Sequence, residues 1–85
     1  MNRARLLRRL HRGAVQNVAF AEMIDLVEGF GFELARVNES HHIFRHLGAP
    51  ALLNLQEVDG QAKPYQIRQF LRIVERYNLT LGDDA

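Results

Sequence analysis

The sequence predicts an α+β domain in which a small antiparallel sheet carries helices on one face. Three observations indicate this class: apolar residues recur at helical spacing near both ends of the chain, alternate with polar residues in its middle, and are interrupted there by short turns. The expected order is α-α-β-β-β-α, with the three strands in one meander. Since so few residues cannot bury both faces of a sheet, the second face is expected to stay open to a ligand.

Length and composition restrict what the chain can be. Its 85 residues predict a single domain with a core of about two layers, and they exclude a large two-domain enzyme with a cofactor crevice. The lack of Cys excludes disulfides, iron–sulfur clusters and thiolate zinc sites. No apolar run approaches the ~20 residues that span a bilayer, and the basic N-terminus lacks the apolar core of a secretory signal. We therefore expect a cytoplasmic protein without membrane contact.

Charge is distributed unevenly along the chain. The first 18 residues hold five arginines and no acid, whereas residues 19–39 hold five acids against one arginine. A basic end suits phosphate or an acidic protein surface, and it also suits a solvated helix face.

Two helices are expected in the first third of the chain. The first covers residues 3–12 and ends at Gly13, with Asn17 in the connector as a candidate cap for the next helix. The second covers residues 19–28, and Gly29-Phe30-Gly31 ends it because glycine adopts the left-handed conformation that closes a helix. The apolar stripes of the two helices are Leu6, Leu7 and Leu10, and Phe20, Met23, Ile24 and Val27.

Three strands are expected next. Residues 32–37 alternate between apolar and polar, residues 41–47 are rich in side chains that suit a pleated surface, and residues 51–57 form the third strand. The third segment also suits a helix, because it is rich in Leu and Ala. Turns are expected at residues 38–40 and 48–50.

The last element is a helix over residues 64–77 that follows a loop at residues 59–63. Pro64 suits its first position and Asn78 suits a left-handed cap at its end. Residues 80–85 are expected to form a frayed acidic tail. The apolar stripe consists of Ile67, Phe70, Leu71, Val74 and Tyr77, and a basic stripe consists of Arg68, Arg72 and Arg76.

Three of the four histidines lie in the second predicted strand. Successive side chains of a strand point to opposite faces, so a buried Phe44 would direct His42 and His46 towards the helices. His41 would then lie on the open face together with Arg45. A slip of one residue in the register would reverse this assignment.

The chemistry of an exposed histidine depends on its substrate. An imidazole exchanges protons near neutral pH, and RNA carries its own nucleophile in the 2′-hydroxyl group. His41 as general base and Arg45 as the cation that holds the phosphate would cleave RNA without metal. The competing interpretation is a surface or core histidine with a structural role. A zinc site is disfavoured, because His42 and His46 would lie ~13 Å apart along a strand.

The order and spacing of several motifs resemble a known family. Residues 31–46 read G-F-E-L-A-R-V-N-E-S-H-H-I-F-R-H, and a third strand and then Lys63-Pro64 at the start of a helix follow them. This pattern resembles the HicA family, the small mRNA interferase toxins of type II toxin–antitoxin systems. The resemblance covers residues 19–79, so that residues 3–12 form an additional basic helix.

The resemblance implies a fold like that of a double-stranded RNA-binding domain and an endoribonuclease activity that needs neither metal nor cofactor. It implies His41 as the catalytic residue, with Ser40 beside it in the motif that contacts RNA. We expect Arg45 to contact phosphate, and Lys63 and Arg68 to hold the RNA backbone at the start of the last helix. The implied partners are mRNA and a HicB-like antitoxin.

One departure from the family pattern bears on activity. Glu39 stands where the family has Gly, at a turn that glycine suits, and its carboxylate would repel phosphate or orient His41. Two other functions therefore remain open. One is a catalytically weak or inactive module that binds RNA or the antitoxin. The other is a protein-interaction domain whose Arg-rich first helix docks an acidic partner.

Overall fold

The computed structural model describes residues 2–82. Its elements are α1 (Arg3–His11), α2 (Phe20–Gly29), β1 (Glu33–Asn38), β2 (His41–His46), β3 (Ala49–Val58), β4 (Gln61–Ala62) and α3 (Pro64–Arg76). The predicted α+β class and the order of its six elements are confirmed, with one strand added. Most of the predicted boundaries lie within one residue of the observed ones.

The four strands form one antiparallel sheet in the order β1-β2-β3-β4. The prediction of three strands was wrong at residues 59–63, where a loop was expected. Asp59 and Gly60 both have positive φ angles, of 53° and 75°, which lets a two-residue turn reverse the chain. The next residues therefore pair with the end of β3, and the Ala62 amide also donates to the Val18 carbonyl.

Strand β3 is longer than predicted. It begins at Ala49, so the turn expected at residues 48–50 is confined to Leu47 and Gly48. An irregular register between Phe44 and His46 lets β2 and β3 pair close to this turn. The helical alternative for residues 51–57 does not occur.

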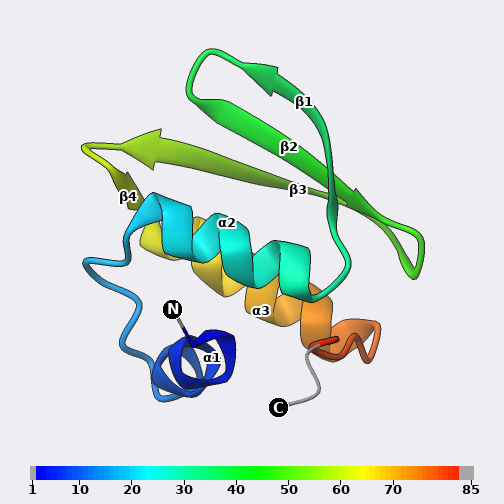
Figure 1. The fold of residues 1–85 in the computed structure, drawn as a ribbon. Helices are drawn as coiled ribbons and strands as arrows, with labels where there is room; N and C mark the ends of the chain where they lie inside the picture. The colour runs from blue at the N-terminus through cyan, green and yellow to red at the C-terminus, as the bar shows by residue number, and fades with distance from the viewer. Residues whose placement is uncertain (1, 83–85) are drawn as a thin grey trace.

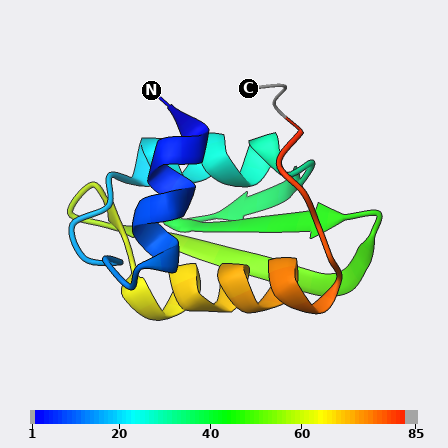
Figure 2. The ribbon, with the colours of Figure 1, turned by 90° about the horizontal axis from the view of Figure 1, so that it is seen from below.

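Helices α2 and α3 lie side by side on one face of the sheet, and α1 packs on the side of this helical layer that is remote from the sheet (Figures 1 and 2). The sequence predicted about two layers, and α1 adds part of a third. Within the described residues, no element covers the other face of the sheet, as expected.

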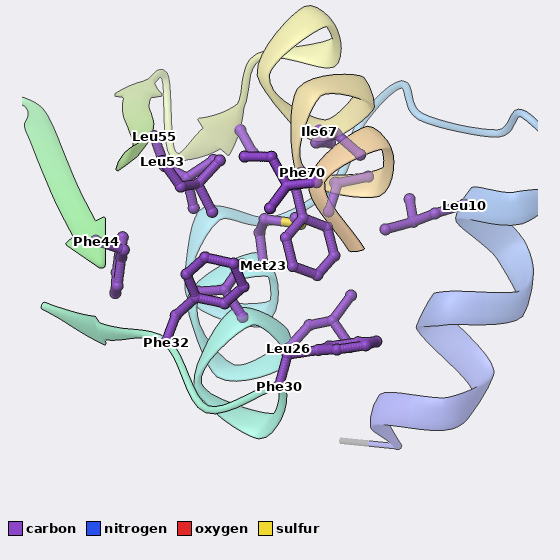
Figure 3. Packing of buried hydrophobic residues seen from close by; sticks show 14 of the residues in the cluster. Leu10, Met23, Leu26, Phe30, Phe32, Phe44, Leu53, Leu55, Ile67 and Phe70 are labelled. Atoms are coloured by element: carbon purple, nitrogen blue, oxygen red, sulfur yellow. The ribbon is translucent and has the colours of Figure 1, made fainter. Parts of the chain in front are cut away.

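The core fills the space between the sheet and the helices (Figure 3). Phe44, Leu53 and Leu55 project from β2 and β3 and are at most 1% exposed. They meet side chains from α2 and α3, and Leu10 of α1 closes the core on its far side. Burial of a large apolar side chain contributes about 1.5–3 kcal/mol, which fixes the register of β2 against the helices.

The ends of the helices explain the path of the chain. Gly31 has a φ angle of 92°, and the amides of Gly31 and Phe32 donate to the carbonyls of Glu28 and Val27, which closes α2 as predicted. Asn17 does not cap α2, because the N-cap residue is Ala19. The Phe20 amide donates instead to the Gly60 carbonyl at 2.8 Å, so that the β3–β4 turn satisfies the start of the helix.

The segment after α3 is ordered against the helices as far as it is described. Asn78 has the predicted left-handed conformation, with a φ angle of 54°. Leu81 packs on the core, and the Gly82 amide donates to the Gly29 carbonyl at 2.8 Å. The prediction of a frayed tail was therefore wrong for residues 80–82, and residues 83–85 lie outside the described part of the chain. Among residues 2–82, none of the helices combines the length with the hydrophobicity that a membrane span requires.

Candidate nucleic-acid interface

The uncovered face of the sheet carries the residues singled out by the sequence. Phe44 is buried under the helices, so His41 and Ile43 project from β2 on the opposite, open side. Across the sheet, His41 stands opposite Asn38 of β1 and Gln56 of β3, and Ile43 stands opposite Arg36 and Asn54. The predicted assignment of faces is confirmed, because the register follows the burial of Phe44.

His41 is half-buried and is held by a neighbouring strand. Its Nδ1 atom lies 3.2 Å from the Oδ1 atom of Asn54. Because an amide oxygen only accepts, this hydrogen bond places the ring proton on Nδ1 and leaves the lone pair on Nε2. A histidine in this tautomer can accept a proton through Nε2, which is what a general base requires.

A chain of hydrogen bonds links the turn beside His41 to helix α3. Gln56 Nε2 donates to Ser40 Oγ at 3.3 Å, and the Gln56 backbone amide donates to Gln66 Oε1 at 2.7 Å. Gln66 is the only buried polar residue of the described chain, at 2% exposure. Loss of its acceptor would leave the Gln56 amide unsatisfied, at a cost of about 1–3 kcal/mol. Gln66 therefore fixes the position of β3, and through it of Ser40, relative to α3.

The other two histidines of β2 have structural contacts, in agreement with their predicted orientation. His46 Nε2 lies 2.7 Å from the Phe30 carbonyl oxygen, and its Nδ1 atom accepts from the Gly48 amide at 2.8 Å. The ring therefore joins the end of α2 to the β2–β3 turn. His42 packs edge-on against Phe20 with ring centroids 4.9 Å apart.

Arg45 is less well placed than the sequence suggested. It is four residues from His41 along β2, which is a backbone separation of ~13 Å in a regular strand. Its Nε atom lies 3.9 Å from a carboxylate oxygen of Glu33, and both side chains are largely exposed. Arg36 lies closer to His41. It pairs with Ile43, which is two residues from His41 on β2, so Arg36 is a diagonal neighbour of His41. Such diagonal neighbours are ~7–8 Å apart, within reach of a long side chain.

The two basic residues that the sequence assigned to RNA binding near the start of the last helix have different positions. Lys63 precedes α3 and is half-buried, with Nζ 5.6 Å from the centroid of the Tyr65 ring. It lies at the end of the sheet where Gln66 joins β3, which is the end that carries His41. Arg68 is exposed on α3, which covers the opposite face of the sheet, and no contact joins it to His41.

Glu39 has a backbone conformation that favours glycine. It is the first central residue of the two-residue turn between β1 and β2, and its φ angle is 57°. Turns of this kind need a positive φ angle at that position. Among the described residues no hydrogen bond joins Glu39 to His41, so Asn54 and not Glu39 orients the ring.

Sequence reasoning did not identify Arg36, Asn54, Gln56 and Gln66 as members of the site. Their separation along the chain hides their proximity, because it depends on the register of three strands and on the packing of α3. Asn54 and Gln56 are polar residues in an otherwise apolar part of the strand predicted at residues 51–57, and this pattern could have indicated that they face a site. No group of three or more metal-ligating side chains occurs among residues 2–82.

The fold and the site together define a small α+β domain whose open sheet face presents an oriented histidine among amide and guanidinium groups. The sequence matches no protein-family model, and no curated protein or solved structure matches it.

Proposed function

We propose that the protein is a HicA-like endoribonuclease, the toxin of a type II toxin–antitoxin system, with a fold like that of a double-stranded RNA-binding domain. The observation that carries this proposal is the hydrogen bond between His41 Nδ1 and Asn54 Oδ1 on the open face of the sheet. It supports Nε2 as a proton acceptor on the uncovered face of the sheet, beside Arg36.

The reaction follows from these groups. Nε2 of His41 takes the proton of an RNA 2′-hydroxyl group, and the 2′-oxygen forms a bond to the adjacent phosphorus. The bond from phosphorus to the 5′-oxygen breaks, and the leaving oxygen takes a proton from water. The products are a 2′,3′-cyclic phosphate and a 5′-hydroxyl end, and the imidazolium returns its proton to solvent. Arg36 stabilises the charge that develops on the phosphate oxygens.

RNA binding would involve three further residues. Ser40 is fixed beside His41 by Gln56, and its hydroxyl group can donate to a phosphate or a ribose oxygen. Lys63 extends the basic surface at the same end of the sheet. Arg45 and Arg68 lie farther from His41 and would contact neighbouring nucleotides or none.

Expression of His41→Ala tests the function. The variant is expected to lose growth arrest and cleavage of purified RNA, because the proposed reaction needs the imidazole as its proton acceptor. His11→Ala, which changes an exposed histidine of α1, serves as the control and should retain both. A His41→Ala protein that cleaves RNA at the wild-type rate would refute the nuclease proposal.

The substrate provides a second test. RNA with 2′-O-methyl groups lacks the nucleophile, so it should bind to the protein and remain intact. Cleavage of unmodified RNA should continue in the presence of EDTA, because the proposed reaction uses no metal. Cleavage of the 2′-O-methyl strand would mean that another nucleophile acts.

A HicB-like antitoxin is the proposed partner. Leu52 is 61% exposed and lies on the open face, since the flanking Leu53 is buried on the other face, so this face offers apolar surface besides its polar groups. A partner that covers it would bury His41 and block the reaction. Leu52→Glu should weaken a complex with the product of a neighbouring antitoxin gene, whereas Leu47→Glu in the β2–β3 turn is the control.

The alternative function is a module that binds RNA without cleaving it. The position of Glu39 favours it, because this carboxylate lies next to Ser40 and would repel an approaching phosphate. RNA that binds to the wild-type protein and remains intact, together with cleavage by Glu39→Gly, would establish this alternative.

A further inference from the structure

A second basic site lies away from the sheet, in a hollow between α1 and α2. Its volume is about 400 Å³, and it is lined by Asn2, Arg5, Leu6, Arg9, Arg12 and Glu22. Three arginines thus line one space together with a single acidic residue, Glu22. Helix α1 has no acidic residue, so nothing on that helix neutralises them.

The other contacts of α1 show which cations are needed for folding. Arg3 donates two hydrogen bonds to the Asp25 carboxylate, at 2.9 and 3.1 Å, and Leu6 and Leu10 are buried against the helices. Arg9 donates to the Gln16 carbonyl at 2.6 Å. Within residues 2–82, Arg5 and Arg12 are exposed and form no ion pair, so their charge does not serve to hold the helix in place.

We propose that this hollow binds phosphate groups of the RNA backbone, as a second contact outside the cleavage site. The guanidinium group presents paired donors that match phosphate oxygens, and several of them around one space suit a polyanion. The identity of the polyanion as RNA rests on the proposed function.

An RNA backbone suits this hollow better than an acidic protein does. The centre of a protein interface is depleted of charged residues and enriched in aromatic ones, whereas four of the six residues that line this hollow are charged and none is aromatic. Affinity for a phosphate backbone arises mainly from the release of its counterions, for which clustered arginines are sufficient.

The position of the hollow determines its effect. Helix α1 and the open face of the sheet lie on opposite sides of the α2–α3 layer (Figures 1 and 2). A short RNA on the open face does not reach the hollow, whereas a long RNA can contact both. The hollow therefore raises the effective concentration of long RNA at His41 and leaves the cleavage of short RNA unchanged.

The experiment compares two double variants of the full chain with equal loss of charge. Arg5→Gln/Arg12→Gln removes two cations from the hollow, and Arg8→Gln/Arg72→Gln removes two exposed cations that do not line it. Binding of a single-stranded RNA of about 40 nucleotides is measured against salt concentration, in a His41→Ala background that prevents cleavage. The hollow variant should lose about 1.4 units of the slope of log K against log salt, since each lost contact accounts for ~0.7.

Glu22→Gln is the reciprocal variant, and it should strengthen RNA binding by about twofold to threefold because it removes the opposing carboxylate.

Equal losses of RNA binding in the two double variants, or no loss in either, would overturn the proposal. So would binding of polyglutamate as tight as that of RNA, which would indicate a protein partner. With His41 intact, the hollow variant should cleave a hexanucleotide at the wild-type rate. Binding is measured in a His41→Ala background, which does not cleave RNA. Failure of the binding test therefore leaves the nuclease proposal standing. Absence of RNA cleavage with His41 intact would likewise leave the binding result valid.

Discussion

The Nδ1 atom of His41 lies 3.2 Å from the Oδ1 atom of Asn54 on the neighbouring strand. This contact determines which ring nitrogen can accept a proton, so that a residue 13 positions away along the chain controls the chemistry of the histidine.

Asn54→Ala should lower the rate of RNA cleavage by about 10- to 100-fold, because the ring loses the partner that fixes its tautomer. Binding of RNA should change little, so the loss is expected in kcat and not in KM. Asn38→Ala is the matched control, since Asn38 stands opposite His41 on β1 and forms no hydrogen bond with it in the described structure. Comparable losses of kcat in the two variants would contradict the assigned role of Asn54.

Arg36 and Arg45 provide a paired test of the phosphate contact. Arg36→Gln should lower kcat/KM by about tenfold or more, because this side chain can reach a phosphate beside His41. Arg45→Gln should have an effect of about twofold or less, since it removes the same charge at a greater distance. Steady-state cleavage of one RNA by the two variants measures this difference in kcat/KM. A larger effect of Arg45→Gln would support the assignment of Arg45 made from sequence.

Glu39→Gly should stabilise the protein by about 1 kcal/mol, because glycine adopts the positive φ angle of this turn without steric cost. Glu39→Ala should give no comparable gain, since alanine keeps the Cβ atom that resists this conformation. Urea unfolding measures the free energy of unfolding of both variants. If the carboxylate repels RNA, the two variants should cleave faster to a similar extent. A gain in stability from Glu39→Ala would show that charge, and not backbone conformation, limits stability here.

The ion pair between Arg3 and Asp25 should make the docking of α1 sensitive to acid. The hydrogen bond from Arg3 holds the pKa of Asp25 below its ordinary value of 3.8, against the smaller opposing effect of burial. The pair therefore stabilises the fold above that ordinary value, and the contribution is lost as the pH falls through the lowered pKa. Because the Asp25 side chain is 42% exposed, Asp25→Asn should cost less than about 1 kcal/mol at neutral pH.

Urea unfolding at a series of pH values measures this effect. The difference between the wild type and Asp25→Asn should shrink as the pH falls below the ordinary Asp value. The double variant Arg3→Gln/Asp25→Asn completes the cycle and separates the pair from the other contacts of Arg3. A difference that stays constant down to the acid transition would exclude a contribution from the titration of Asp25.

The class of fold and most of the element boundaries follow from local patterns in the sequence. Periodicity places the three helices, because a residue's burial depends on its position in a repeat of fixed length. Alternation of apolar and polar residues also places β1, although all six of its residues are exposed. The motif around His41 also indicated the face on which this residue lies, since Phe44 has to be buried.

Which residues lie together in the site depends on how the strands and helices pair and pack. Whether Arg36 or Arg45 is the neighbour of His41 depends on the pairing of β1 with β2, and the contact with Asn54 depends on the pairing of β2 with β3. The fourth strand arose in the same way, from contacts of a short polar segment with β3 and with the residues before α2. Such pairings join residues that are far apart in the chain, so the local secondary-structure preferences of each segment do not predict them.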